Sequence, residues 1–148
     1  MIANGMRFGF SSASPVSWTE VLNLRDIGPP QEVADRVDNT VHNITSRRKT
    51  SEPGLITVSD PFVTVKQDLT DATQKALRTA KAARTLLYIR WEIPTNDAGT
   101  QWLGFECQAR VATFEPTGTT PGDLQTTKYS FMVDSDIYED AAAGASKF

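Results

Sequence analysis

Three successive stretches in the second half of the sequence have the two-residue alternation of β-strands, and this pattern most constrains the fold. The stretches are Thr85–Pro94, Trp102–Phe114 and Leu124–Ile137. Turn residues separate them, at Asn96–Gly99 and at Thr117–Gly122. Strands joined by short turns pair as antiparallel neighbours. The sequence therefore predicts an antiparallel β-meander in this half of the chain.

The first half adds strands, which prolines interrupt. Trp18–Ile27 is predicted to be a strand that ends at Gly28-Pro29-Pro30, because proline fixes φ and lacks a backbone donor. Leu55–Lys66 is rich in β-branched and aromatic residues, and Pro61 within it indicates a bulge or an edge position. Glu32–Val41 is either a further strand or an irregular crossing.

One stretch has the period of a helix. Thr70 or Asp71 can cap a helix that begins near Ala72, and the pattern predicts a helix over about residues 71–84. The order is then three strands, one short helix and three strands. This order indicates a mainly β protein, an antiparallel β-sandwich or barrel with one flanking α-helix.

Both ends of the chain are predicted to be arms. Residues 1–17 are rich in Gly, Ser, Ala and Asn, with Phe8 and Phe10 as anchors, and residues 138–148 are small and polar until Phe148. Such segments order only against something else. We therefore expect an arm over 1–17, a β-domain over 18–137 and a second arm over 138–148.

Composition limits the chemistry. The chain has 148 residues, enough for one domain, and a net charge of −3, which argues against a dedicated nucleic-acid binder. One cysteine and one histidine make a disulfide, a cysteine cluster or a zinc site unexpected. No apolar run approaches the roughly 20 residues of a membrane span, and the N-terminus does not resemble a secretory signal. We expect no cofactor and no membrane partner, and folding in a cytoplasm.

Two residues could in principle be catalytic. His42 lies near Asp38 and Ser46, but no GxSxG motif is present, so we interpret His42 as a polar residue at a loop entrance or a subunit contact. Cys107 lies within a strand pattern and is interpreted as a small buried hydrophobe. The expectation is that the protein is not an enzyme.

Two charged groups are interpreted as solvated or as contacts. The acidic cluster after the last strand lacks EF-hand spacing and is interpreted as a solvated tail; its members are Asp134, Asp136, Glu139 and Asp140. From Asn43 to Gly54 the chain is almost wholly polar, and Arg47, Arg48, Lys49 and Glu52 in it are interpreted as a charged contact to another subunit.

From about Trp18 to Ile137 the order of motifs resembles the tail tube (major tail) proteins of long, non-contractile-tailed bacteriophages. Asp71–Arg78 reads DATQKALR, similar to a helix of that family, and residues 100–116 contain Gly-Phe after Trp and end in Phe-Glu-Pro. Pro53-Gly54-Leu55 matches the end of the family's long polar loop. The family's Asp-Val-Thr motif is matched loosely at Asp38–Thr40, and Asp134-Ser135 replaces its usual glycine.

The resemblance implies a tail-tube-like β-sandwich that assembles as hexameric rings, with strands of every subunit lining a shared β-barrel lumen. It implies that the loop with Arg47, Arg48, Lys49 and Glu52 reaches the adjacent ring, and that the arms, through Phe8, Phe10 and Phe148, bridge neighbours. The implied partners are further copies of the chain and other tail proteins (tape measure, tail terminator and distal tail proteins). The implied location is the virion tail, through which DNA passes without specific binding.

A conduit for DNA should not hold phosphate tightly, because each neutralised phosphate adds affinity through counterion release. We therefore hypothesise that Glu92, Glu106 or Glu115, on the late strands, contribute charge that faces the lumen.

Two other functions remain open. A ring protein of a type VI secretion-like tube would share the fold and differ in partners. A small β-sandwich ligand-binding module could use Trp91, Trp102 and Tyr129 as stacking platforms, although their alternation with polar residues favours packing roles.

Overall fold

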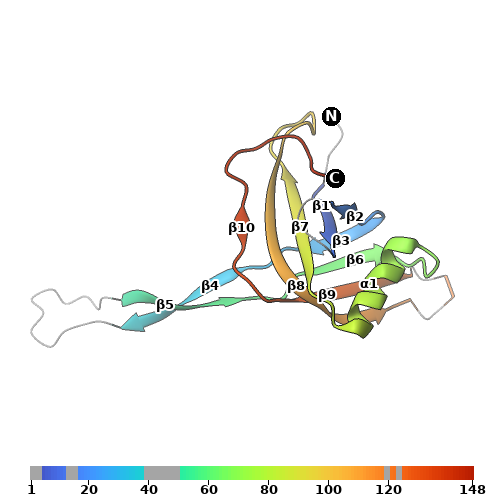
Figure 1. The fold of residues 1–148 in the computed structure, drawn as a ribbon, viewed down its shortest axis with the longest axis horizontal. Helices are drawn as coiled ribbons and strands as arrows, with labels where there is room; N and C mark the ends of the chain where they lie inside the picture. Colours follow the sequence, from blue (N-terminus) through green and yellow to red (C-terminus); the bar gives the residue numbers. More distant parts are fainter. Residues whose placement is uncertain (1–4, 13–16, 39–50, 119–120, 123–124) are drawn as a thin grey trace, which may run out of the picture. The chain divides into compact units, whose positions relative to one another are not determined.

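The computed structural model describes residues 5–12, 17–38, 51–118, 121–122 and 125–148, and for 35–38 and 51–54 the backbone alone (Figure 1). The chain divides into two compact units. The larger one consists of Met1–Pro29 and Asp60–Phe148, and the smaller one is Pro30–Ser59.

The larger unit is built on one antiparallel sheet of eight strands. Seven strands follow the order β2-β1-β7-β8-β9-β6-β3, and β10 pairs with β8 outside this path. The strands are β1 (Arg7–Ser11), β2 (Thr19–Glu20), β3 (Leu24–Gly28), β6 (Phe62–Lys66), β7 (Leu87–Pro94), β8 (Trp102–Pro116), β9 (Thr126–Val133) and β10 (Tyr138–Glu139). The predicted meander is confirmed as β7-β8-β9, in which each strand pairs with the next.

One short segment connects the two ends of this sheet. Strands β2 and β3 lie at opposite ends of the strand order, yet three residues separate them in the chain. The Val21 amide donates to the Phe8 carbonyl at 2.9 Å, and the Lys66 amide donates to the Asn23 carbonyl at 3.0 Å. The sheet therefore curls until both of its ends bond to the same segment, as in a barrel.

The strand predicted over Trp18–Ile27 is wrong as a single element. Asn23 has a φ of 61°, in the left-handed region that asparagine tolerates better than most residues. The backbone turns at this residue, so that β2 pairs with β1 while β3 pairs with β6.

The predicted helix is confirmed as α1 (Ala72–Ala83), with Asp71 at its N-cap and Arg84 in a left-handed conformation at its C-cap. Gln74, Leu77 and Ala80 are its buried residues. The buried amide of Gln74 donates to the Lys66 carbonyl at 3.0 Å, which satisfies a polar group that would otherwise destabilise the core.

The core of the larger unit lies between the curled sheet and α1. Its members include Val65, Leu77, Ile89, Ala109 and Phe131, each with 0% of its surface exposed. Burial of this apolar surface is the main stabilising term of the fold.

The smaller unit is a two-stranded ribbon made of β4 (Glu32–Asp38) and β5 (Ser51–Val58). Glu32–Val41, left open above, thus contains β4. The polar stretch 43–54 was expected to be a loop, but Ser51–Gly54 belong to β5, because cross-strand bonding to β4 does not require apolar side chains. The strand predicted over Leu55–Lys66 is two strands in two sheets, β5 and β6, with Pro61 between them.

Candidate assembly surfaces

The ribbon β4–β5 exposes apolar side chains on both of its faces. Val33 stands opposite Thr57 in the register, which puts Val33 on the same face as Leu55, while Ile56 lies on the other face. The three apolar side chains are 61%, 81% and 63% exposed, in that order. A ribbon with both faces apolar and exposed resembles an interface more than a solvated hairpin.

The outer edges of the ribbon are open. Among the described residues no third strand joins β4 or β5, so each strand leaves one row of backbone groups without a strand partner. Open edges of this kind are templates for pairing with another chain.

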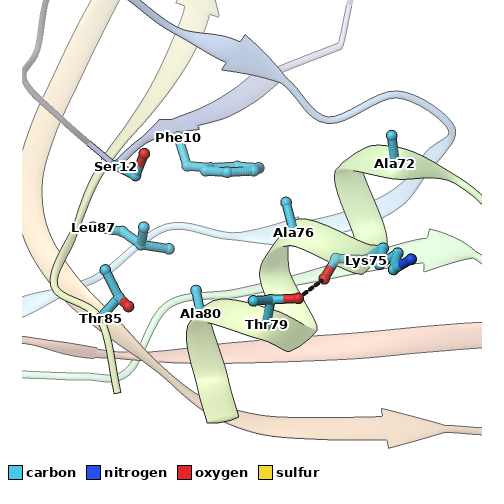
Figure 2. Close-up of a pocket in the computed structure, with 9 residues that line it drawn as sticks. All are labelled: Phe10, Ser12, Ala72, Lys75, Ala76, Thr79, Ala80, Thr85 and Leu87. Carbon is cyan, nitrogen blue, oxygen red and sulfur yellow. Dashed lines mark hydrogen bonds between the residues drawn. The ribbon is translucent and has the colours of Figure 1, made fainter. Parts of the chain in front are cut away.

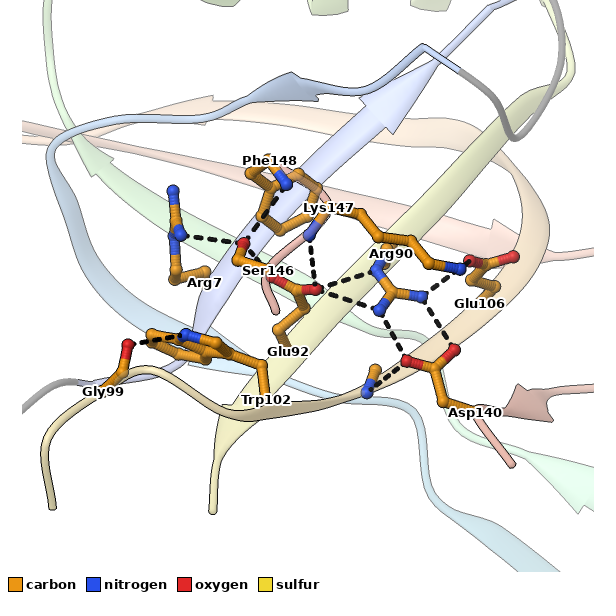
Figure 3. A network of polar contacts seen from close by, with 11 residues as sticks. Arg7, Arg90, Glu92, Gly99, Trp102, Glu106, Asp140, Ser146, Lys147 and Phe148 are labelled. Atoms are coloured by element: carbon orange, nitrogen blue, oxygen red, sulfur yellow. Dashed lines mark hydrogen bonds and ion pairs between the residues drawn. The ribbon is translucent and has the colours of Figure 1, made fainter. Parts of the chain in front are cut away.

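A buried arginine on β7, in the larger unit, binds three carboxylates. Arg90 on β7 is 1% exposed, and its guanidinium contacts three carboxylates (Figure 3). Its Nη2 lies 2.9 Å from Glu92 Oε2 and 2.7 Å from Asp140 Oδ2, and its Nη1 lies 2.7 Å from Glu106 Oε1. Glu92 lies on β7 itself, Glu106 lies on the neighbouring strand β8, and Asp140 belongs to the C-terminal segment, which is thereby tied to the sheet.

The carboxylates fix the charge state of this group. Burial alone would lower the pKa of Arg90, but hydrogen bonds and charge from Asp140 and Glu92 raise it above its ordinary value. The hydrogen bond from Arg90 lowers the pKa of Asp140. Both groups are therefore ionised at neutral pH.

Residues 138–148, here called the C-terminal strap, bind along the sheet as far as the last residue. Gly144 forms an antiparallel bridge with Trp102. The Ser146 hydroxyl donates to Glu92 Oε1 at 2.5 Å and accepts from Arg7 Nη1 at 2.8 Å. The strap therefore satisfies the second oxygen of Glu92, which is completely buried.

The strap ends in an aromatic socket. The Phe148 ring meets Trp18 edge-on, with centroids 6.3 Å apart, and the Arg7 guanidinium lies 5.5 Å from the centroids of both Phe148 and Trp102. A Cβ at Gly9 would overlap the Phe148 ring. The ring can therefore occupy this position only because residue 9 has no side chain.

These contacts correct the expectation of two arms. Phe8 and Phe10 are 2% and 6% exposed in β1, which pairs with β7, so they belong to the core of their own subunit. Phe148 binds within its own chain in the same way. The expectation for residues 1–17 fails because β1 pairs with β7, about 80 residues away in the sequence. The composition of residues 1–17 does not reveal this pairing.

The three glutamates expected in the lumen have different surroundings. Glu92 is 0% exposed and bound to Arg90, which corrects the expectation for this residue, because a buried carboxylate cannot line a channel. The Glu106 side chain is 23% exposed and also pairs with Arg90. Glu115, near the end of β8, is exposed and stands opposite Lys128.

The predicted ring-stacking residues are only partly described. Arg47, Arg48 and Lys49 lie outside the described residues, as do His42 and Ser46. Glu52 lies in β5, where it pairs with Val37 in the register.

Cys107 is 2% exposed, which confirms its interpretation as a buried hydrophobe. Burial raises the pKa of its thiol to about 12, so at neutral pH it is a poor nucleophile. The three residues considered as stacking platforms, Trp91, Trp102 and Tyr129, are buried and pack within the subunit. Among the described residues, no group of three or more His, Cys, Asp or Glu is placed to hold a metal ion.

Two grooves flank α1. The first has a volume of about 430 Å³ and lies between the helix, Phe10 and the start of β7 (Figure 2). Small side chains of the helix line it, among them Ala72, Ala76 and Thr79. The second, of about 310 Å³, lies between the end of α1 and strands β8 and β9. No helix in the described part of the chain is long and apolar enough to cross a bilayer.

The Arg90 cluster is not apparent from the sequence. Tyr88, Arg90 and Glu92 alternate with apolar residues and therefore resemble a solvated face. One sequence feature does point to the cluster. Arg90 and Glu92 are two residues apart on one strand face, and an acidic segment that includes Asp140 follows the last strand of the meander. Opposite charges on one strand face can neutralise one another under a covering segment.

No protein-family model matches the sequence, and no curated protein matches it either. Solved structures do match the fold. A chain of the anti-feeding prophage (AFP) baseplate aligns with a TM-score of 0.72 at 7% identity, over 94% of each chain. A chain of the native gene transfer agent (GTA) virion aligns with a TM-score of 0.71 at 9% identity, over 95% of this chain and 99% of that one.

The tail tube of SPP1 aligns over 99% of this chain and 80% of its own, with a TM-score of 0.68 and 15% identity. At these identities the likeness concerns the fold. The described part of this chain thus has a tail-tube-like fold, a mainly antiparallel β-sheet with a single α-helix.

Proposed function

We propose that the chain is a structural virion protein that polymerises as stacked hexameric rings into the tail tube of a phage, the conduit for DNA delivery into the host. The observation that carries this proposal is the ribbon β4–β5, with open edges and with Val33, Leu55 and Ile56 exposed.

The ribbon supports assembly because it is incomplete alone. A two-stranded ribbon is marginally stable in water, and a third strand or a packed face is needed to stabilise it. Pairing of ribbon edges between neighbouring copies would supply the third strand and would also cover the exposed apolar side chains. When every copy repeats this contact around a ring, the edges close into a shared barrel and no open edge remains.

The fold and its relatives support the same role. The SPP1 chain belongs to a tail tube, and the AFP chain comes from an assembly described as six-fold symmetrised. Six-membered rings of this chain are proposed on that likeness. Other tail proteins at the two ends of the tube, and a tape measure within it, are proposed as further partners.

The proposed lumen is weakly acidic or neutral. Glu115 is exposed and the net charge of the chain is −3, and both are compatible with such a wall. DNA that gains little counterion-release affinity from a wall can pass along it. Contacts between rings are proposed for Arg47, Arg48, Lys49 and Glu52, which belong to the polar stretch 43–54 of the sequence.

Electron microscopy of the purified protein tests the proposal. We expect hollow filaments of uniform width from the wild type, and their loss in Leu55→Asp, which places a charge on the exposed face of the ribbon. Leu22→Asp is the matched control, since Leu22 is 61% exposed and lies in the larger unit. Protein that stays monomeric when concentrated would refute the tube function.

A second candidate is a ring protein of a DNA-free injection or type VI secretion-like tube. A likeness to a chain of an extracellular contractile injection system favours it, with a TM-score of 0.68, the same as that of the SPP1 tail tube. Particles that carry the protein separate the two functions: a phage tail is attached to a capsid that contains DNA, whereas an injection apparatus has no capsid.

A further inference from the structure

Strands β8, β9, β6 and β3 of the larger unit form a part of the sheet that ends in two open edges. Strand β3 is the last in the strand order, so its outer edge has no strand partner in the described part of the chain. Strand β8 has β7 beside it only as far as Ala109, which pairs with Leu87. Figure 1 shows β8 as one long curved strand that continues beside β9. Among the described residues, the outer edge of Arg110–Pro116 is therefore open as well.

Both edges are accessible. The Ile27 amide of β3 donates to the neighbouring Asp26 Oδ1 at 2.9 Å, so it is not bonded to β6 and belongs to the outer edge. A side chain here takes the place of a strand partner. On β8, the second groove of α1 is lined by Arg110, Val111 and Ala112, among others, so the helix leaves the start of this edge uncovered.

The core-facing side chains at the two edges are incompletely buried. On the inner strands, Val65 of β6 and Tyr129 of β9 are 0% exposed. Leu24 pairs with Val65 and Phe114 pairs with Tyr129, which puts each pair on the same face of the sheet. Leu24, Ile27 and Phe114 are nevertheless only half-buried. The apolar layer of the sheet thus stops short at both ends, and one more strand at each edge would complete it.

Strand direction allows the two edges to pair with each other in different copies. Strands β8, β9, β6 and β3 each run antiparallel to the next, so β3 runs opposite to β8. When copies repeat around an axis, β3 of one copy beside β8 of the next makes an antiparallel pair, like every other pair in the sheet. Such a head-to-tail contact closes into a ring or extends into a filament.

The two edges cannot pair within one copy. They lie at opposite ends of the order β8-β9-β6-β3 and face away from each other. Three strand spacings of about 4.8 Å, roughly 14 Å together, separate the two strands. The pairing therefore needs a second copy.

The irregularities of the two strands also match. Each strand has one bulge, which shifts its register against the strand beside it. The bulge sets the core-facing residues three positions apart, where a regular strand has two or four: Leu24 and Ile27 on β3, Val111 and Phe114 on β8. In an antiparallel pair Leu24 then stands beside Phe114 and Ile27 beside Val111, with no further irregularity.

Charge favours the same register. It places Arg25 of β3 opposite Thr113 of β8 and diagonal to Glu115. Arg25 and Glu115 are exposed, and neither has an ion-pair partner in the described part of the chain. Diagonal neighbours on paired strands are within reach of long side chains, so the two charges can meet across the contact.

We propose that the outer edge of β3 (Leu24–Gly28) pairs antiparallel with the outer edge of Arg110–Pro116, on β8, of a second copy of this chain, with Leu24 beside Phe114. This inference rests on the proposed tube function, for which it names a strand pair that joins neighbouring subunits besides the ribbon edges.

Disulfide cross-linking tests the pair. Arg25→Cys and Thr113→Cys are combined in a Cys107→Ala background, and the assembled protein is oxidised in air with copper phenanthroline. The two positions stand opposite each other in the proposed pair, where a disulfide fits, whereas within one copy they are too far apart for one. Arg25→Cys with Asp97→Cys is the matched control, because Asp97 is exposed in the turn before β8, away from the proposed contact.

We expect the test variant to give a ladder of cross-linked copies on a non-reducing gel, and the control to give at most about a tenth as much. Mass spectrometry of the unreduced peptides must identify links between positions 25 and 113, and circular dichroism checks that each variant is folded. Tubes in which these positions link no more than the control would overturn the contact and leave the tube function standing.

Charge reversal is a second test that needs no cysteine. Arg25→Glu places a like charge near Glu115 and should raise the critical concentration for assembly, measured by sedimentation, about threefold or more. Adding Glu115→Arg to the same chain should restore it to within about twofold of wild type. A double variant that stays as impaired as Arg25→Glu would overturn the register.

If the wild type makes no hollow filaments, the tube function fails separately. Cross-linking of the concentrated protein in solution then decides the contact. Links between positions 25 and 113 of different copies would uphold it, and their absence would overturn it too.

Discussion

Arg90 and Asp140 form a two-pronged ion pair across 50 residues of sequence. Nη2 of Arg90 contacts Asp140 Oδ2 at 2.7 Å, and Nη1 contacts Asp140 Oδ1 at 3.1 Å. Asp140 Oδ2 also accepts a hydrogen bond from the Gly104 amide at 3.0 Å. Strand β10 contributes only two residues to the sheet and so attaches the C-terminal strap weakly by itself. The bidentate pair of Arg90 and Asp140 is therefore a main attachment of the strap.

Replacing Arg90 by methionine is expected to destabilise the protein by about 3–5 kcal/mol, the usual cost of breaking a buried ion pair. The reason is that Glu92, which is 0% exposed, would lose its cation inside the protein. The free energy of unfolding from urea denaturation measures the effect. Arg25→Met is the control, since Arg25 is exposed and should change stability by at most about 0.5 kcal/mol. Equal stability of the two variants would show that the cluster contributes nothing.

Gly104→Ala is expected to loosen the strap, because a Cβ at this position would overlap the guanidinium of Arg90. Three carboxylates hold that group, so it cannot move aside freely, and overpacking of this kind costs about 1–3 kcal/mol. Gly144→Ala is the matched control within the strap, since a Cβ there meets nothing within 4 Å. Hydrogen exchange of residues 138–148 should accelerate in the first variant and stay unchanged in the second.

The strap should detach in acid. The hydrogen bond from Arg90 lowers the pKa of Asp140 from its ordinary value of 3.8. A carboxyl with a lowered folded-state pKa contributes stability above the unfolded pKa and loses it as the pH falls through the folded one. The free energy of unfolding should therefore fall with pH below about 4.

Asp140→Asn removes this titration, so the slope of stability against pH below about 4 should be shallower in the variant. The wild type and the variant are compared by urea denaturation at several pH values. Identical slopes would mean that Asp140 is not held by Arg90 in solution.

The parts of the fold that sequence predicted are those with local signals. Helix α1 combines an aspartate at its N-cap position, Asp71, with apolar residues at helical spacing, and β7 to β9 combine alternation with turn residues. Each of these elements is specified mostly by its own residues and near neighbours.

The parts that sequence missed depend on distant partners. Strand β1 contains Gly9, a residue of low β-propensity, and pairs with β7, which is distant in the sequence. At Gly9 the Phe148 ring approaches so closely that a Cβ would overlap it. The strap resembles a solvated tail until Arg90 is known to be buried. The division of Trp18–Ile27 at Asn23 follows from closure of the sheet, which no local pattern specifies.

Cys107 should be inert in the folded protein. With its pKa raised to about 12, about one ten-thousandth of the thiol is ionised at pH 8, and its side chain is 2% exposed. We expect a thiol reagent such as DTNB to react with native protein on the order of a thousandfold more slowly than with protein unfolded in guanidinium. Leu22→Cys in a Cys107→Ala background is the control, because position 22 is exposed and should react promptly in the native state. Prompt reaction of native wild-type protein would place the thiol at the surface and reopen the possibility of a nucleophilic role.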